Sequence, residues 1–156
     1  MPAARRELPS SYEEAARLLE SAAADHRRVR FVGGATKLSW GVPVEDVSVE
    51  VSSTLFNQIL EHNHADLTAV VQAGVRLSEA QAAFAEKGQM LAADPPAGDE
   101  DAATIGGVVA TGDSGPMRHR YGAMRDLLVG MKAALPKGTV AASGGKVIKN
   151  VAGYDL

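Results

Sequence analysis

The residues of this sequence that could do chemistry are mostly small ones, and the first group of them follows an apolar run. Residues 33–37 read Gly-Gly-Ala-Thr-Lys and come directly after Val-Arg-Phe-Val at 29–32. Glycines permit positive φ and let backbone N–H groups converge on an anion without interference from a Cβ. Thr36 adds a hydroxyl donor and Lys37 a positive charge, so this segment suits a pyrophosphate cradle. A plain tight turn is the simpler interpretation of Gly-Gly-x-Thr taken alone.

A second group lies in a stretch without hydrophobic periodicity between residues 94 and 122. Pro95 and its neighbour Pro96 predict a rigid turn, and residues 103–107, Ala-Thr-Ile-Gly-Gly, predict a bend that opens an apolar run. Small residues at such a bend allow the backbone to approach a flat ligand closely. Long loops in compact domains are usually functional. A loop-rich surface with a buried bend is the competing interpretation.

Two further groups complete the set. The third runs from Ser114-Gly115-Pro116 through Arg-His-Arg-Tyr-Gly at 118–122 to Arg125-Asp126, and it is also compatible with a polar turn before a strand. The fourth is the string Gly-Gly-Lys-Val-Ile-Lys-Asn-Val-Ala-Gly-Tyr-Asp-Leu at 144–156.

Other chemistries are excluded by spacing or by composition. Val140 and Val147 stand where a Walker A loop needs glycine and Ser or Thr, and no Gly-x-Gly-x-x-Gly follows a strand-like run. The absence of cysteine removes disulfides, thiolate metal sites and cysteine nucleophiles from this chain. His62 and His64 share a face if they lie in a strand, but Asp66 is the sole nearby addition and no third ligand is apparent. We therefore predict a polar turn there, and no metal site.

The bulk composition is that of one compact domain or of two small lobes that share a core. The chain has 156 residues, a net charge of −3 and no basic stripe of the kind that nucleic acid requires, so we expect no nucleic-acid partner. No apolar run is long enough to span a bilayer, and the N-terminal residues lack the apolar core of a signal peptide. We expect a cytoplasmic protein, with peripheral contact with the inner face of the membrane left open.

The elements that must position these groups are short strands mixed with a few helices. Residues 11–25 predict a helix with a capping box at Ser11 and Glu14, and residues 78–86 a second one with a capping box at Ser78 and Gln81 that ends at Gly88. Strands are predicted at 29–32, 47–51 and 67–73, and a hairpin joins 127–135 to 139–142 through Pro-Lys-Gly at 136–138. This order favours an α+β fold over alternating βαβ units.

In this order, the four groups resemble the FAD-binding domain of the vanillyl-alcohol-oxidase/PCMH-type flavoprotein superfamily. The resemblance runs from about residue 29 to 156 and is strongest at 103–107, at 120–126 and in the terminal string. It implies a PCMH-type FAD-binding domain of two small α/β lobes, about 1–93 and 94–156. The second lobe is expected to be incomplete at the C-terminus, and the substrate or cap domain to be absent.

The resemblance also implies which residues contact the cofactor. The glycine-rich loop would wrap the FAD pyrophosphate, the Thr-Ile-Gly-Gly segment would contact flavin and ribityl, and the segment after it would line the same channel. Lys149, Asn150 and Tyr154 would pack beside the cofactor, in roles that the resemblance does not define. The cofactor-binding residues so implied are Gly33, Gly34, Ala35, Thr36, Lys37, Pro95, Thr104, Gly106, Gly107, Thr111, Ser114, Gly115, Tyr121 and Gly122.

Two departures from the family pattern bear on the cofactor. Ala35 stands where the family usually carries a third glycine, and its methyl group would either crowd a phosphate or restrict φ. Members that bind FAD covalently often use a histidine near this loop, and residues 33–36 contain none, so we expect non-covalent FAD.

The function implied is that of an oxidoreductase component in which FAD accepts a hydride from a 2-hydroxy acid, of the glycolate or D-lactate type, to give the 2-oxo acid. Substrate-oxidising residues would lie outside this chain or on a partner, so no catalytic residue is assigned. Other oxidase subunits, including an iron–sulfur subunit, are the expected partners. The alternative is a non-catalytic FAD-binding or scaffold module of a multi-subunit complex, with this chain inactive alone. A flavin reductase of cell-wall precursor synthesis shares the fold, but the Gly-Tyr-Asp-Leu terminus argues against it.

Overall fold

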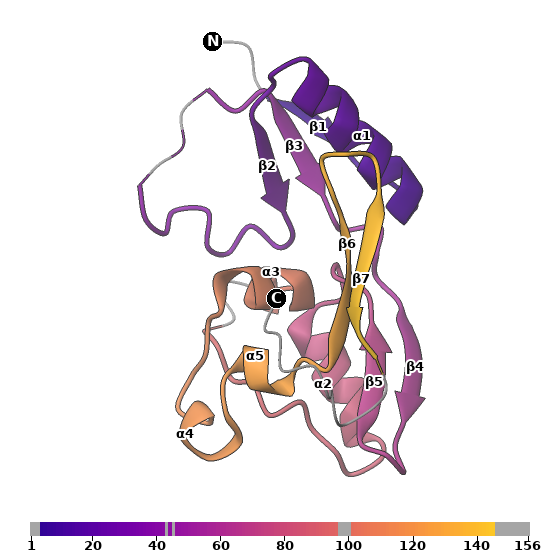
Figure 1. Cartoon of the computed structure of the whole chain (residues 1–156). Helices are drawn as coiled ribbons and strands as arrows, with labels where there is room; N and C mark the ends of the chain where they lie inside the picture. Colours follow the sequence, from indigo (N-terminus) through magenta and orange to yellow (C-terminus); the bar gives the residue numbers. More distant parts are fainter. Residues whose placement is uncertain (1–3, 43, 45, 97–100, 146–156) are drawn as a thin grey trace.

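The computed structural model describes residues 4–42, 44, 46–96 and 101–145. The fold mixes helices with short strands, which confirms the α+β expectation (Figure 1). Its elements are, in chain order, β1 (Arg5–Glu7), α1 (Tyr12–Ala24), β2 (Val29–Val32), β3 (Val49–Ser52), β4 (Ile59–Asn63), β5 (Thr68–Val71), α2 (Leu77–Ala85), α3 (Ile105–Thr111), α4 (Arg118–Tyr121), α5 (Met124–Leu127), β6 (Gly130–Ala134) and β7 (Val140–Gly144).

A three-stranded parallel sheet in the order β1-β3-β2 begins the fold. The strand β2 has the predicted bounds, and β3 begins two residues later than predicted. Val49 and Val51 of β3 are buried with Leu19 of α1, so the helix packs on this sheet. Because β1 and β2 are both parallel to β3, β1–α1–β2 is a βαβ unit. Sequence reasoning missed this unit because β1 has three residues, too few to show a periodicity.

The helix α1 begins at its predicted cap. The Ser11 hydroxyl accepts a hydrogen bond of 3.1 Å from the Glu14 N–H. The Glu14 carboxylate reaches back to Ser10, whose N–H and hydroxyl donate at 2.7 and 2.8 Å. The Glu14 carboxylate therefore binds chiefly Ser10, one residue before the predicted cap, and the Ser11 backbone is a weaker donor to it.

The next elements are an antiparallel pair, β4 and β5, followed by α2. The predicted capping box at Ser78 is wrong, because α2 begins at Leu77 and the Glu79 carboxylate accepts instead from the Arg76 N–H at 3.3 Å. The Gln81 side chain, predicted to cap, binds the backbone of Leu91 from both of its polar atoms at 2.7 and 3.0 Å. The cap position therefore lies two residues before the predicted one, with the acidic residue of the helix's own first turn reaching back to the cap backbone.

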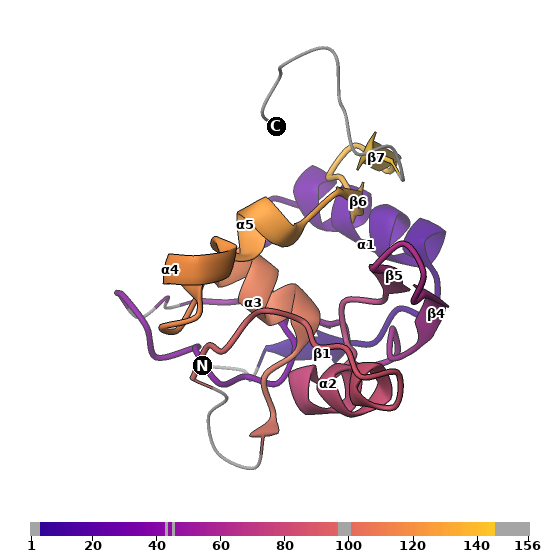
Figure 2. The same ribbon diagram turned by 90° about the horizontal axis from the view of Figure 1, so that it is seen from below.

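The segment at 94–122, predicted to lack hydrophobic periodicity, contains two short helices, α3 and α4. Thr104 caps α3, since its hydroxyl oxygen accepts from the Gly107 N–H at 3.3 Å, and the helix ends at Gly112 with φ +61°. The helices α4 and α5 lead from there toward β6 (Figure 2). The bend predicted at residues 104–107 is therefore a helix N-terminus.

The hairpin formed by β6 and β7 confirms the predicted one, although Leu127, the first residue of its predicted first strand, ends α5 and β6 begins at Gly130. The turn is closed by a hydrogen bond of 2.8 Å from the Leu135 N–H to the Thr139 carbonyl. The hairpin runs alongside α1 (Figure 1), and Ala134 packs against the core beneath that helix.

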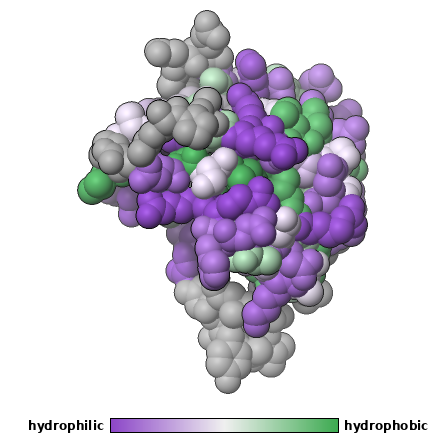
Figure 3. Space-filling model, turned by 90° about the horizontal axis from the view of Figure 1, so that it is seen from above, coloured by the Kyte–Doolittle hydropathy of each residue, from purple (hydrophilic) through white to green (hydrophobic). Residues whose placement is uncertain are grey.

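Two further core clusters lie beyond the sheet. Val75, Ala80 and Phe84 form one, Ala93, Ala103, Val108 and Met124 form the other, and Leu91 packs against both. Figure 3 shows the molecule of Figure 1 from above. This face is mostly hydrophilic, and hydrophobic residues form smaller groups between the hydrophilic ones. The lobe boundary near residue 93 stays a prediction, and the terminal motif with Lys149, Asn150 and Tyr154 lies outside the described residues.

Candidate functional site

A cleft of about 500 Å³ opens at the carboxyl edge of the parallel sheet. In Figure 1 the strands β2 and β3 point toward α3, and the loops that follow them form the cleft walls together with residues before α2 and α3. This edge is where parallel sheets bind ligands, because the loops diverge there. The lining residues are Arg6, Val32, Gly33, Gly34, Ala35, Thr54, Asn57, Gly74, Arg76, Glu79, Ala102 and Thr104.

Two glycines of the loop after β2 are required by packing. A Cβ on Gly34 would overlap the Ala102 carbonyl, and one on Gly33 would overlap the Thr104 hydroxyl. The loop therefore lies directly against the segment that precedes α3. The glycine-rich backbone predicted to cradle a phosphate also joins the sheet to the second half of the described chain.

The segment before α3 is held by backbone hydrogen bonds to the stretch that precedes α2. The Ile105 N–H donates to the Val75 carbonyl at 2.9 Å, and the Leu77 N–H donates to the Ala103 carbonyl at 2.8 Å. Thr104 between them is 4% exposed, and its hydroxyl faces both Gly33 and the first turn of α3. Backbone and cap hydrogen bonds thus fix this wall of the cleft.

Two arginines bring positive charge to the cleft. The Arg6 guanidinium donates to the Ser52 hydroxyl at 3.3 Å, and Ser52, at the end of β3, is fully buried. Arg76 precedes α2, and Glu79 of that helix lines the same cleft. Sequence reasoning missed both arginines, because the strand that carries Arg6 and the cap position of Arg76 became visible only in the fold.

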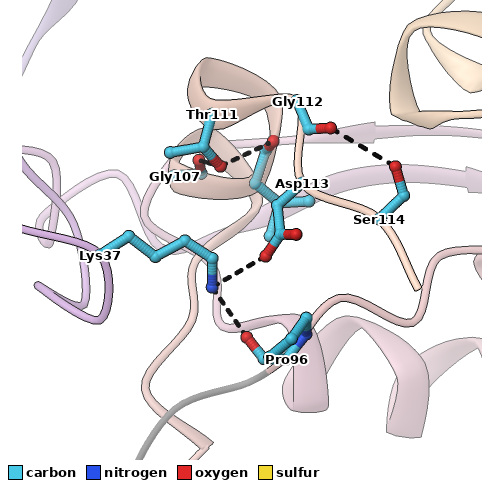
Figure 4. Close-up of polar contacts among 8 residues, drawn as sticks. Lys37, Pro96, Gly107, Thr111, Gly112, Asp113 and Ser114 are labelled. Carbon is cyan, nitrogen blue, oxygen red and sulfur yellow. Dashed lines mark hydrogen bonds and ion pairs between the residues drawn. The ribbon is translucent and has the colours of Figure 1, made fainter. Parts of the chain in front are cut away.

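The predicted site residues fall into separate places. Gly33, Gly34, Ala35 and Thr104 line the cleft, Thr36 lies in the turn that follows, and Gly106 and Gly107 form the first turn of α3. Thr111 and Ser114 lie at the end of α3 and just after it, near Lys37 and Pro96 (Figure 4). Gly115 lies against Asp94, in the segment that contains Pro95. Tyr121 and Gly122 end α4 and are not among the residues that line the cleft.

The histidines singled out by their spacing have other partners. The His62 ring nitrogen lies 2.9 Å from the Gln89 amide oxygen, and its ring lies against Phe84 at a centroid distance of 4.7 Å. Within the described residues, no group of three or more metal-ligating side chains is placed to hold a metal ion.

A second, smaller cavity of about 210 Å³ lies between α1 and β1. Its charged residues are paired, since Arg5 contacts Glu7 at 2.6 Å and Arg27 contacts Asp25 at 3.0 Å. Because these charges are already paired with one another, the cleft at the sheet edge is the better candidate site for a ligand.

A preformed cleft at the edge of a parallel sheet, with a glycine-rich turn and two cations in its wall, is the arrangement of a domain that binds a phosphate-containing cofactor. A family model described as an FAD binding domain matches residues 4–144. The chain belongs to this FAD binding domain family, and its cofactor is FAD. The PCMH-type resemblance predicted from the motifs is confirmed.

Similar proteins include oxidase subunits and a dehydrogenase. The glycolate oxidase subunit GlcE of Escherichia coli is 36% identical over 80% of this chain and 35% of its own length. The glycolate oxidase subunit GlcD of Bacillus subtilis is 34% identical over 95% of this chain and 31% of its own. A mitochondrial D-lactate dehydrogenase of Arabidopsis thaliana is 32% identical over 95% of this chain and 25% of its own. The chain thus spans about a quarter to a third of the length of these relatives.

Solved structures share the fold. An alkyldihydroxyacetonephosphate synthase superposes with a TM-score of 0.73 at 27% identity, covering 89% of this chain and 28% of that one. A berberine bridge enzyme variant superposes with a TM-score of 0.71 over 89% of this chain and 28% of its own, and at 18% identity it supports the fold alone.

The lining of the cleft combines the glycine-rich segment Gly33–Ala35 with two arginines and the acidic Glu79. Backbone N–H groups and cations are the groups that a diphosphate requires. The close approach of this segment to Ala102 shows a backbone with no room for side chains on that face.

None of the described helices is long and apolar enough to cross a membrane.

Proposed function

We propose that this chain is the FAD-holding part of a flavin-dependent oxidoreductase that converts a 2-hydroxy acid, of the glycolate or D-lactate type, to the 2-oxo acid. The proposal is supported by the family, by relatives named as glycolate oxidase subunits and D-lactate dehydrogenases, and above all by the cleft at the sheet edge. FAD, when bound, supplies the acceptor for the hydride that leaves the hydroxyl-bearing carbon.

The described residues have a binding role in this proposal. The backbone of Gly33–Ala35 receives the diphosphate, with Arg6 and Arg76 as its cations, and Thr104 fixes the wall against which the cofactor lies. Binding is non-covalent, since residues 33–37 contain no histidine or cysteine. We assign no catalytic base among the described residues.

The proposed setting is a multi-subunit enzyme. Two of the relatives are named as oxidase subunits. These 156 residues contain no cysteine and supply no thiolates for an iron–sulfur cluster, so we place such a cluster outside them, on a partner subunit. A cytoplasmic location, with contact to the inner face of the membrane through the partners, fits this assembly.

A titration with FAD tests the binding role. We expect saturable, one-to-one binding that quenches flavin fluorescence and is competed by ADP, while FMN, which lacks the adenosine half, binds more weakly. A folded protein that leaves FAD free at concentrations well above those of flavoenzymes would contradict the proposal. If FMN and FAD bound with equal affinity, the diphosphate and the adenosine of FAD would contribute nothing to binding in the cleft, which would contradict the proposed site.

Turnover separates the enzyme from the alternative of a non-catalytic module. The FAD-loaded chain is offered glycolate, D-lactate and D-2-hydroxyglutarate, with an artificial dye as electron acceptor. We expect no dye reduction by this chain alone and reduction when the remaining polypeptides of its complex are added. If the complete complex oxidised none of the three acids, the result would contradict the proposed activity and support the alternative of a non-catalytic FAD-binding module.

A further inference from the structure

The lysine of the glycine-rich loop points away from the cleft. The Lys37 ammonium lies 3.0 Å from the Asp113 carboxylate and donates to the Pro96 carbonyl at 2.8 Å (Figure 4). It also lies 5.0 Å from the centroid of the Trp40 ring. Lys37 is not among the residues that line the cleft, although its loop neighbours 33–35 are.

The ion pair is buried. The side chains of Lys37 and Asp113 are each 9% exposed, and the carboxylate oxygen that faces the ammonium is itself inaccessible to solvent. Attraction between charges is strong in such a place, and a charge left there without its partner is costly. The net charge of the pair is zero, so it adds little attraction for a diphosphate in the cleft.

The pair joins three segments that are distant in sequence. Lys37 follows β2, Pro96 belongs to the irregular segment at 93–96, and Asp113 comes two residues after α3 ends. The segment at 93–96 is fixed a second time, because both Asp94 carboxylate oxygens accept from the Met117 N–H at 3.2 Å. Each of the three segments carries residues that the resemblance places against FAD.

We propose that Lys37 and Asp113 are a positioning pair. Their ion pair holds the loop after β2, the segment at 94–96 and the residues after α3 in the arrangement that receives FAD, and Lys37 does not bind the diphosphate. This inference rests on the proposed function, since it concerns how the same cofactor is received. It reassigns Lys37 from a ligand of the cofactor to a residue that acts through its neighbours.

The substitution Asp113→Asn separates the two roles of Lys37 by the sign of its effect. A lysine that binds the diphosphate is freed when the competing carboxylate is neutralised, so FAD affinity would rise or stay the same. A positioning pair is broken by the same change, so we expect the Kd for FAD to rise about tenfold or more. Lys37→Met is expected to weaken binding by a similar factor. Asp66→Asn and Lys87→Met, at exposed positions, are the matched controls and should leave the Kd unchanged.

The double variant Lys37→Met with Asp113→Leu keeps the test valid if a single variant does not fold. Replacing a buried ion pair by two apolar side chains is often neutral for stability. We therefore expect the double variant to bind FAD within about threefold of wild type, closer than either single variant, because their effects are not additive. A double variant as weak as Lys37→Met would overturn the positioning role and support a phosphate-binding lysine.

Trp40 gives a second readout that does not depend on the cofactor. It is the single tryptophan of the chain and lies beside the Lys37 ammonium. Its fluorescence in the cofactor-free protein should change in Asp113→Asn and Lys37→Met, and stay as in wild type in the two controls. Unchanged Trp40 emission together with unchanged FAD affinity in Asp113→Asn would overturn the inference and leave the proposed function intact. Failure of the wild-type protein to bind FAD would instead contradict the proposed function itself.

Discussion

At the scale of single residues, Ala35 has an unusual backbone conformation for its type. Its φ is +60°, in the left-handed region, where a residue with a Cβ is disfavoured by roughly 1–2 kcal/mol. The residue is exposed, so its methyl group has space. Of the two effects considered for the missing third glycine, the structure shows the one on φ. Crowding of a phosphate by the methyl group stays a prediction, because Ala35 lines the cleft proposed to receive the diphosphate.

The substitution Ala35→Gly is expected to stabilise the protein by about 1 kcal/mol, because glycine adopts this conformation without the steric cost. Ala23→Gly is the matched control, since Ala23 is exposed within α1, where glycine costs about 1 kcal/mol. Urea unfolding of both variants measures the difference. A loss of stability in Ala35→Gly, like the loss expected in Ala23→Gly, would contradict the left-handed conformation assigned to residue 35.

The carboxylate of Glu14 links stability to pH. Its hydrogen bonds from the Ser10 N–H and then from the Ser10 hydroxyl lower the pKa of Glu14 below its ordinary value of 4.5. A lowered pKa in the folded state means a contribution that is present above about pH 4.5 and lost as the pH falls through the lower folded value. The sign is therefore stabilisation at neutral pH.

We expect the stability difference between wild type and Glu14→Gln to be full near about pH 6 and to shrink progressively below pH 4.5. Ser10→Ala removes the hydroxyl donor and keeps the backbone donor, so it should retain part of the dependence. Urea unfolding at several pH values makes the comparison. A difference that does not vary with pH would show that the charge of Glu14 is not involved.

At the scale of elements, α3 depends on contacts as much as on its own sequence. It begins Ile-Gly-Gly, and glycine is a poor helix former. Its start is fixed by the Thr104 cap and by the backbone bonds to the segment before α2. This is why the sequence predicted only a bend there, while the longer α1 and the hairpin of β6 and β7 could be predicted from periodicity and turn residues.

The hydroxyl of Thr104 is the part of that cap that can be removed cleanly. Thr104→Val keeps the shape and loses the acceptor, so we expect a loss of about 1 kcal/mol in unfolding free energy. Thr104→Ser keeps the hydroxyl and serves as the control for the cap. If the serine variant lost as much as the valine variant, packing of the methyl group would outweigh the cap.

The candidate site could be predicted only in part. The glycine-rich loops were visible in the sequence because their chemistry lies in the backbone, and the backbone follows from glycine and its neighbours. Arg6, Arg76 and Asp113 were not visible, because each reaches its place through pairing between segments distant in the sequence. Lys37 is a further example. Its positive charge suggested that it binds a phosphate, and the sequence alone did not show that Asp113 is its partner.

At the scale of the whole molecule, the loop after β2 connects the parallel sheet to the second half of the described chain. Gly34 lies against the Ala102 carbonyl with no space for a side chain. Gly34→Ala should therefore cost about 1–3 kcal/mol in unfolding free energy and weaken FAD binding together with it.

Gly145→Ala is the control for this change. Gly145 has open space where a Cβ would be, so its unfolding free energy should stay within about 0.5 kcal/mol of wild type. Thermal or urea unfolding with and without FAD compares the two variants. Equal, small effects would show that the loop and residue 102 move apart freely.

The central claim is that the cleft at the carboxyl edge of the parallel sheet receives the diphosphate of FAD. A crystal structure of the protein with FAD bound tests it most directly. We predict electron density for the diphosphate against the backbone of Gly33–Ala35, with Arg6 and Arg76 beside it and the Lys37–Asp113 ion pair intact. Density for the diphosphate at another place on the protein, with this cleft empty, would contradict the account.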